Sequence, residues 1–242
     1  MDRESVTKLP LLLIAVVLPV ALHAQMAELA SHVLPAPATR ALSDSLRSAA
    51  PHARHIWRDT APENRDGTIN AYVEIARGDR RKWEFDMRSH VRRIDRMMPE
   101  DVGGYPINYG FVPQTVSYDG DPFDVLILGP ALEGGQVVRG MAVGLMFMED
   151  EKGADSKVVI STVDRNGRPV HELTASTRRE VADYFRRYKK HQPSAFSRVP
   201  GWGTAKDGLT LVRLTHQFFS RCRPPAVSPC SIDRTSEAGA RN

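Results

Sequence analysis

The chain has 242 residues, of which 41% are hydrophobic and 26% are charged. This composition allows one domain with a substantial core, and it excludes fibrous, wholly disordered and multispanning membrane proteins. The formal net charge of +4 at pH 7 is too small to indicate a nucleic-acid-binding surface or any other particular partner.

The first segment contains an uninterrupted apolar run over residues 9–22, followed closely by Ala24. The run is shorter than the roughly 20 residues that span a bilayer as a helix. We therefore expect a signal peptide at 1–24, cut near Ala24, and an exported mature protein, periplasmic or secreted, with no stable membrane span. The alternative is an uncleaved anchor or a buried strand, because Asp2 and Glu4 offset the positive charge usual before such a run. Without a signal the protein would be cytoplasmic.

Two further segments flank the part of the chain that is rich in strand patterns. Residues 25–66 are rich in Ala, Ser, Pro and Arg with little periodicity, which predicts a linker. Residues 67–220 form the expected catalytic domain, and 221–242 form an expected flexible tail. The tail holds both cysteines, Cys222 and Cys230, in a Pro-rich stretch. A local disulfide in an oxidising compartment and a pair of reduced thiols are both open.

Short β-rich runs with turn residues between them dominate the first part of this domain. They predict strands at 69–76, 82–86, 91–95, 124–128, 137–148 and 157–162. Thr177 and Glu180 have the spacing of a capping box, and apolar residues at helical intervals follow, so a helix is expected over 177–190. A second helix is expected after Asp207. The pattern indicates a mainly β (α+β) domain, a small β-barrel with two packed helices.

Three acids, Asp119, Asp121 and Asp124, lie within six residues just before an apolar strand. Carboxylates this close repel one another unless a cation lies among them, and an all-oxygen set favours a hard ion such as Mg²⁺, Mn²⁺ or Ca²⁺. The spacing does not fit an EF-hand loop, and a phosphatase nucleophile motif would follow its strand rather than precede it. A turn with solvated acids accounts for the triplet equally well.

The wider set of charged residues decides between these interpretations. Asp150 and Asp155 belong to a second acidic cluster ahead of Lys157, and Glu74 interrupts an apolar strand. Lys82 and Glu84 are two apart, so they share one face of a strand. Together these acids and bases indicate a site for a highly charged phosphate compound with several divalent ions.

With these residues in place, the sequence resembles the family I soluble inorganic pyrophosphatases. The most specific stretch is NYGFVPQTVSYDGDPFDVLIL at 108–128, and supporting stretches follow family order: YVEIA, KWEFD, IDRMM, GGYPINYG, EDEKGADSK and RYKK. The resemblance implies a five-stranded OB-like closed β-barrel with two packed helices. It also implies hydrolysis of pyrophosphate to two orthophosphates with several Mg²⁺ ions, Mn²⁺ or other divalent ions being possible substitutes, and a homo-oligomer.

The resemblance also assigns roles to individual residues. It implies metal binding by six acids: Asp119, Asp121, Asp124, Asp150, Asp155 and Glu74. It implies phosphate contacts for six others: Lys82, Arg96, Tyr109, Lys157, Tyr188 and Lys189. Asp121 would be the general base, helped in catalysis by Lys82, Arg96, Tyr109 and Lys189. Glu84 and Tyr105 would line the site in supporting roles.

Two other functions compete with hydrolysis of pyrophosphate. An OB-like barrel could bind polyphosphate or single-stranded nucleic acid without catalysis, although the crowded acids would repel the phosphates of either ligand unless metal is present. Hydrolysis of organic diphosphates would need a base-stacking pocket. The apolar segment at the N-terminus departs from the usual cytosolic family pattern, and residues 162–175 do not align with it.

Overall fold

The computed structural model describes residues 53–87, 89–117 and 120–222. The expected signal peptide, most of the expected linker, Asp119 and the tail beyond residue 222 lie outside the described residues. The expected disulfide also lies outside them, because the side chain of Cys222 and the whole of Cys230 are not described.

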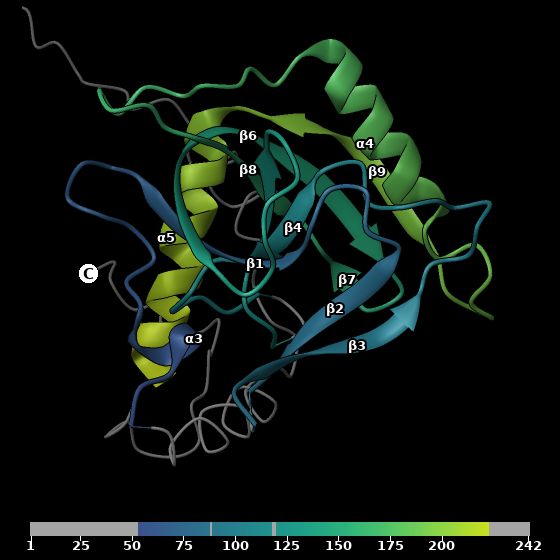
Figure 1. Cartoon of the computed structure of the whole chain (residues 1–242), viewed down its shortest axis with the longest axis horizontal. Coiled ribbons are helices and arrows are strands. Elements are labelled where there is room, and N and C mark those ends of the chain that lie inside the picture. The colour runs from purple at the N-terminus through teal and green to yellow at the C-terminus, as the bar shows by residue number, and fades with distance from the viewer. Residues whose placement is uncertain (1–52, 88, 118–119, 223–242) are drawn as a thin grey trace, which may run out of the picture.

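The described chain is mainly β-sheet, with three helices packed around it (Figure 1). In chain order the elements are α3 (Ile56–Asp59), β1 (Ile69–Ile75), β2 (Arg81–Asp86), β3 (Val91–Met97), β4 (Asn108–Phe111), β5 (Asp124–Leu128), β6 (Val137–Asp150), β7 (Gly153–Ala154), β8 (Lys157–Thr162), α4 (Ala175–Arg187), β9 (Ser197–Gly203) and α5 (Ala205–Cys222). Each of the six strands predicted from the sequence is present. Strands β4, β7 and β9 were not predicted.

Five strands form a closed ring of backbone hydrogen bonds. Strand β1 pairs with β4, β4 with β5, β5 with β8, β8 with β6, and β6 returns to β1. All of these pairs are antiparallel except β5 with β8, which is parallel. Strands β2 and β3 lie outside the ring as a separate antiparallel hairpin. The ring fixes the β5 and β8 ends from which several site residues project.

The central strands are apolar on both faces because both faces are buried in the core. In β5, Val125 and Ile127 belong to the cluster that includes Leu211 and Val212 of α5. Their neighbours Leu126 and Leu128 belong to the cluster that includes the α4 residues. This double burial explains the continuous apolar runs in β5 and β8, which otherwise would alternate with polar residues.

Helix α4 begins earlier than the sequence predicted. Thr174 is the N-cap, and its side chain accepts a hydrogen bond from the backbone N–H of Thr177. Thr177 therefore lies within the first turn, so its spacing from Glu180 does not mark the start of the helix. Val181 and Phe185 are buried, as the periodicity predicted.

Helix α5 also begins before the predicted point. Thr204 and Asp207 cap it reciprocally: the Thr204 N–H donates to Asp207 Oδ2 at 2.8 Å, and the Asp207 N–H donates to Thr204 Oγ1 at 3.2 Å. Leu211 and Phe218 are buried on one face, as expected. No helix in the described part of the chain is long and apolar enough to cross a membrane.

The part of the expected linker that the structure describes, 53–66, packs on the domain. It contains α3, and Trp57 in this helix is completely buried against Phe219 of α5, with ring centroids 5.2 Å apart. The ordered unit therefore includes residues ahead of β1.

Candidate active site

An open cleft of about 290 Å³ lies between the β2–β3 hairpin, the strand ends of the ring and the C-terminal end of α4. The residues predicted for the site line it almost completely: Glu74, Lys82, Glu84, Arg96, Tyr105, Tyr109, Asp121, Asp124, Asp150, Asp155, Tyr188 and Lys189. Lys157 is buried directly beneath the lining, and Asp119 is outside the described residues. The structure thus brings together side chains from widely separated parts of the sequence.

The parallel pairing of β5 and β8 builds the floor of the cleft. Because Val125 pairs with Val158, the first residues of the two strands, Asp124 and Lys157, are neighbours. Lys157 Nζ lies 2.5 Å from Asp124 Oδ2 and 2.8 Å from Asp155 Oδ1. Burial alone would lower the pKa of Lys157, but the two carboxylates raise it, so the ammonium stays charged.

Asp155 lies in the same environment, but there the balance of burial and charge favours the neutral form. Burial, together with the nearby charge of Asp124, raises the pKa of Asp155 to about 8, although Lys157 opposes the shift. One lysine therefore does not fully compensate the two carboxylates. The floor retains an excess of acid that a further cation would stabilise.

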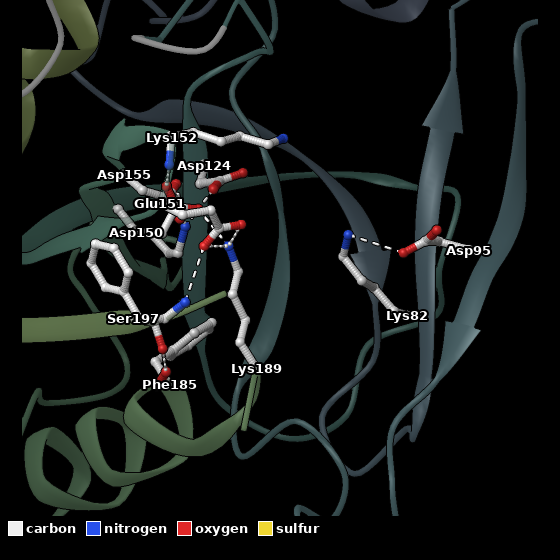
Figure 2. Close-up of polar contacts among 12 residues, drawn as sticks. Lys82, Asp95, Asp124, Asp150, Glu151, Lys152, Asp155, Phe185, Lys189 and Ser197 are labelled. Atoms are coloured by element: carbon white, nitrogen blue, oxygen red, sulfur yellow. Dashed lines mark hydrogen bonds and ion pairs between the residues drawn. The ribbon is translucent and has the colours of Figure 1, made fainter. Parts of the chain in front are cut away.

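A second buried ion pair closes the neighbouring side of the cleft. Asp150 ends β6, and Lys189 follows α4; Lys189 Nζ lies 2.6 Å from Asp150 Oδ2 and 2.8 Å from Glu151 Oε1. Figure 2 shows Lys189 reaching up from the end of the helix into this acidic group. The pair joins a helix end to a strand end across the site.

The β2–β3 hairpin forms the opposite wall. Lys82 pairs with Arg96 in the hairpin register, so both basic side chains come from adjacent positions. Asp95 lies in the register shift and holds both, with its Oδ2 3.2 Å from Lys82 Nζ and 2.8 Å from Arg96 Nη1. Lys82 also contacts Glu84. In Figure 2, Lys82 and Asp95 stand apart from the acid cluster, facing it across the cleft.

Glu74 lies at a register shift in β1 and is buried under the hairpin. Its Oε1 accepts a hydrogen bond from the Phe85 N–H at 2.7 Å. Burial raises the pKa of Glu74 to about 8, more than this hydrogen bond lowers it. Glu74 is a second carboxyl group in the site whose charge has too little compensation.

Three tyrosines complete the lining. Burial raises the pKa of Tyr105, Tyr109 and Tyr188 above the usual value, and nearby acids, Asp124 among them, add to the shift for all three. Their hydroxyl groups are therefore neutral donors at ordinary pH. Lys157 Nζ also lies 5.5 Å from the centroid of the Tyr109 ring.

Comparison with known proteins agrees with this geometry. The sequence profile of the inorganic pyrophosphatases matches residues 71–220. The chain belongs to the inorganic pyrophosphatase family. The inorganic pyrophosphatase of Sulfolobus acidocaldarius is 32% identical over 63% of this chain and 91% of its own length. That of Thermus thermophilus is 36% identical over 64% of this chain and 90% of its own length.

Solved structures give the same result. The crystal structure of the Thermus thermophilus inorganic pyrophosphatase superposes with a TM-score of 0.63 at 29% identity, covering 69% of this chain and 99% of that one. The inorganic pyrophosphatase of Coxiella burnetii superposes with a TM-score of 0.61 at 32% identity, covering 66% and 99%. Both relatives are matched over nearly their whole length, whereas about a third of this chain lies outside each match.

Three charged residues at the cleft were not assigned to the site from the sequence. Asp95 holds Lys82 and Arg96, Glu151 holds Lys189, and Lys152 lines the cleft. Glu151 and Asp95 stand next to residues that were predicted. Their contacts depend on the hairpin register and on the α4 end, which local sequence does not reveal.

The described residues fit the divalent cations that the pyrophosphatase family uses, without forming a complete cation site. In the parts of the chain that are described, no three acidic, His or Cys side chains converge as a metal cluster. The available donors are carboxylates, which suit hard divalent ions. Two of them, Glu74 and Asp155, have pKa values raised to about 8, chiefly because burial disfavours their charged forms more than their present partners favour them.

Proposed function

We propose that this protein hydrolyses inorganic pyrophosphate to two orthophosphates in the cleft between the hairpin and the acidic strand ends. The observation that carries the proposal is that one cleft brings together acidic and basic side chains from separate elements of the fold. Carboxylates from β5, β6 and the segment before β8 face Lys82 and Arg96 from the hairpin. Membership of the inorganic pyrophosphatase family supports the same activity.

The basic residues and tyrosines would bind the substrate. Pyrophosphate carries several negative charges that repel an incoming nucleophile, so binding must neutralise and orient it. Lys82 and Arg96 would contact phosphate from one wall, and Lys189 and Tyr188 from the other, with the neutral Tyr109 hydroxyl as a further donor. Arg96 can contact two phosphate oxygens at once, whereas Lys82 acts as a compact charge.

The acidic residues would supply the chemistry. Asp124, Asp150, Asp155 and Glu74, with Asp119 and Asp121, would hold Mg²⁺, which would neutralise substrate charge and lower the pKa of a water so that hydroxide can form near neutral pH. Asp121 would accept the proton of the attacking water. Lys157 would hold Asp124 and Asp155 in place through its two ion pairs. Glu84 and Tyr105 line the cleft and would support these groups.

The proposal also includes a barrel architecture, export and self-association. The five-stranded ring supports an OB-like closed barrel as the architecture. Export through a signal peptide cut near Ala24, and self-association, are proposed from the sequence and the family resemblance. The cleft's acids make single-stranded nucleic acid a poor alternative ligand, because phosphates would meet negative charge on one wall.

A phosphate-release assay tests the proposed activity. The purified chain should release orthophosphate from pyrophosphate with Mg²⁺ and release none with EDTA. Asp121→Asn should reduce the rate by about 10²-fold to 10⁴-fold, the usual contribution of a general base. Glu133→Gln, a matched acid-to-amide change at an exposed position away from the cleft, should retain full activity. Binding of pyrophosphate without phosphate release would instead support a binding protein, and faster release from a nucleoside diphosphate would support an organic substrate.

A further inference from the structure

The segment 55–59 lies outside the family match at 71–220 but packs against two parts of the site. Figure 1 shows its helix, α3, beside α5 at the end of the molecule toward which the turn of the β2–β3 hairpin points. The segment contacts both this hairpin and the loop 112–117 that leads into the acidic motif. We call residues 55–59 the N-terminal clamp and residues 112–117 the acid loop.

The clamp contacts the hairpin turn through two histidines, His55 of the clamp and His90 of the turn. His55 Nε2 lies 3.1 Å from the Met87 carbonyl oxygen, and a carbonyl only accepts, so this nitrogen donates. The other ring nitrogen of His55 then accepts from the Arg58 N–H at 3.4 Å. His90 Nε2 accepts from the Ile56 N–H at 3.0 Å, and the two imidazoles stack with centroids 4.5 Å apart.

The same clamp holds the acid loop through Trp57. Trp57 Nε1–H donates to the Thr115 carbonyl at 3.0 Å, and the Gln114 N–H donates to the Trp57 carbonyl at 2.8 Å. The Gln114 side chain donates to the Arg58 carbonyl at 2.8 Å. The Trp57 side chain is completely buried, so its bond to Thr115 is protected from water.

Both attachment points lead directly to site residues. The hairpin carries Lys82, Glu84 and Arg96, yet it lies outside the ring, and a two-stranded hairpin is marginal on its own. Its position relative to the acids therefore depends on contacts with the rest of the chain, both those with β1, such as the Phe85 N–H bond to Glu74, and those at its turn. In the acid loop, Thr115 Oγ1 accepts from the Phe123 N–H at 2.9 Å, one residue before Asp124.

We propose that the N-terminal clamp is a positioning element that sets the distance between the basic hairpin wall and the acidic wall of the cleft. His55 is the positioning residue for Lys82 and Arg96, and Trp57 is the positioning residue for Asp121 and Asp124. The link to catalysis rests on the proposed pyrophosphatase activity. The contact with the hairpin is independent of it.

Three single substitutions in the full chain test the clamp. His55→Phe removes the ring nitrogens but keeps an aromatic ring beside Phe85 and His90, and Trp57→Phe removes the bond to Thr115. Glu63→Gln is the control. Glu63 follows the clamp in the chain and forms an ion pair with Arg213 of α5, away from the cleft, which this substitution weakens. Far-UV circular dichroism and thermal unfolding establish that each variant is folded.

Amide hydrogen exchange reports the position of the hairpin without reference to activity. His55→Phe should speed exchange in β2 and β3 by about fivefold, the effect of losing one ordinary hydrogen bond. Trp57→Phe should do so in the acid loop, whereas Glu63→Gln should leave both unchanged. Unchanged exchange in His55→Phe, or an equal increase in Glu63→Gln, overturns the proposal.

Kinetics then report positioning rather than stability. His55→Phe should raise KM for pyrophosphate by about threefold to tenfold with a smaller change in kcat, because the hairpin contacts bind phosphate before the reaction. A lower thermal stability with unchanged KM would show a purely structural role and refute positioning. If the wild-type chain releases no phosphate, the proposed function fails, and the affinity for imidodiphosphate by calorimetry replaces KM. An affinity equal to wild type then refutes the clamp.

Discussion

Lys157 is a buried cation whose role follows from its neighbours. Its side chain is 2% exposed and contacts two carboxylates at 2.5 and 2.8 Å. A buried pair of this kind adds little stability relative to an apolar replacement, but removing one partner leaves the remaining charge without compensation. Here the remaining charge would be that of two acids on the cleft floor.

Replacing this lysine should therefore be costly. Lys157→Met keeps much of the side-chain volume and should destabilise the fold by about 3–5 kcal/mol, because Asp124 and Asp155 lose their common cation. Urea unfolding at pH 7 measures the change. Lys206→Met removes a lysine from an exposed position of α5 and should cost less than about 0.5 kcal/mol. Equal losses in the two variants would show that the ion pairs contribute nothing to stability.

At the scale of elements, the close approach of β4 to β1 places two site residues. Gly110 pairs with Val73, and each is next to a site residue in its own strand: Tyr109 precedes Gly110, and Glu74 follows Val73. A Cβ atom at Gly110 would lie 1.8 Å from the Tyr72 carbonyl oxygen. Only glycine therefore permits this strand spacing at that point.

Gly110→Ala should force the two strands apart. We expect a loss of stability of about 1–3 kcal/mol, typical of overpacking, and a lower kcat because Tyr109 and Glu74 would shift. Thermal unfolding and phosphate release measure the two effects. Gly167→Ala is a control in an open turn, where no atom lies within 4 Å of the added Cβ but the backbone φ of +75° adds strain. Activity at the wild-type level in Gly110→Ala would show that the strand spacing does not position the site.

The same elements show what the sequence could predict. Strands with strong apolar runs, such as β5 and β8, were predicted because their signal is local. Strand β4 was missed because it is short and contains Gly110, and because the hydrogen-bond partners of its buried Asn108 side chain are distant in sequence. Asn108 Nδ2 donates to the carbonyl groups of Ile127 and Pro130, and its Oδ1 accepts from the N–H groups of Arg77 and Leu132. Strand β9 contains Pro200 and two glycines, which argue against a strand unless a partner such as β6 supplies the pairing.

At the same scale, the sequence predicted most of the charged side chains that meet in the cleft but not how they pair. The motif identified the acids and lysines, but the pairing of Lys82 with Asp95 depends on the irregular register of the hairpin. The pairing of Lys189 with Glu151 depends on where α4 ends relative to β6. Neither follows from local spacing.

At the scale of the whole molecule, the small net charge of +4 conceals a strongly polarised cleft. Seven acidic and four basic side chains line it, and Lys157 lies beneath them. The N-terminal clamp contacts the hairpin turn and the acid loop, and residues that follow α4 line the cleft from another side. Folding therefore gathers like charges whose repulsion opposes the native state, and a bound cation would relieve it.

This imbalance predicts that divalent cations stabilise the folded chain. At 100 times its dissociation constant, an ion that binds only the native state contributes about 2.7 kcal/mol, which corresponds to a rise in Tm of roughly 5–10 °C for a domain of this size. Thermal unfolding in Mg²⁺, with KCl at matched ionic strength as the control, measures the rise. Asp124→Asn should reduce it, because the variant removes an acid from the cleft floor, whereas Glu133→Gln should retain it. A Tm that Mg²⁺ and KCl raise equally would show that the acidic wall binds no specific cation, and the proposed catalytic role of these acids would fail with it.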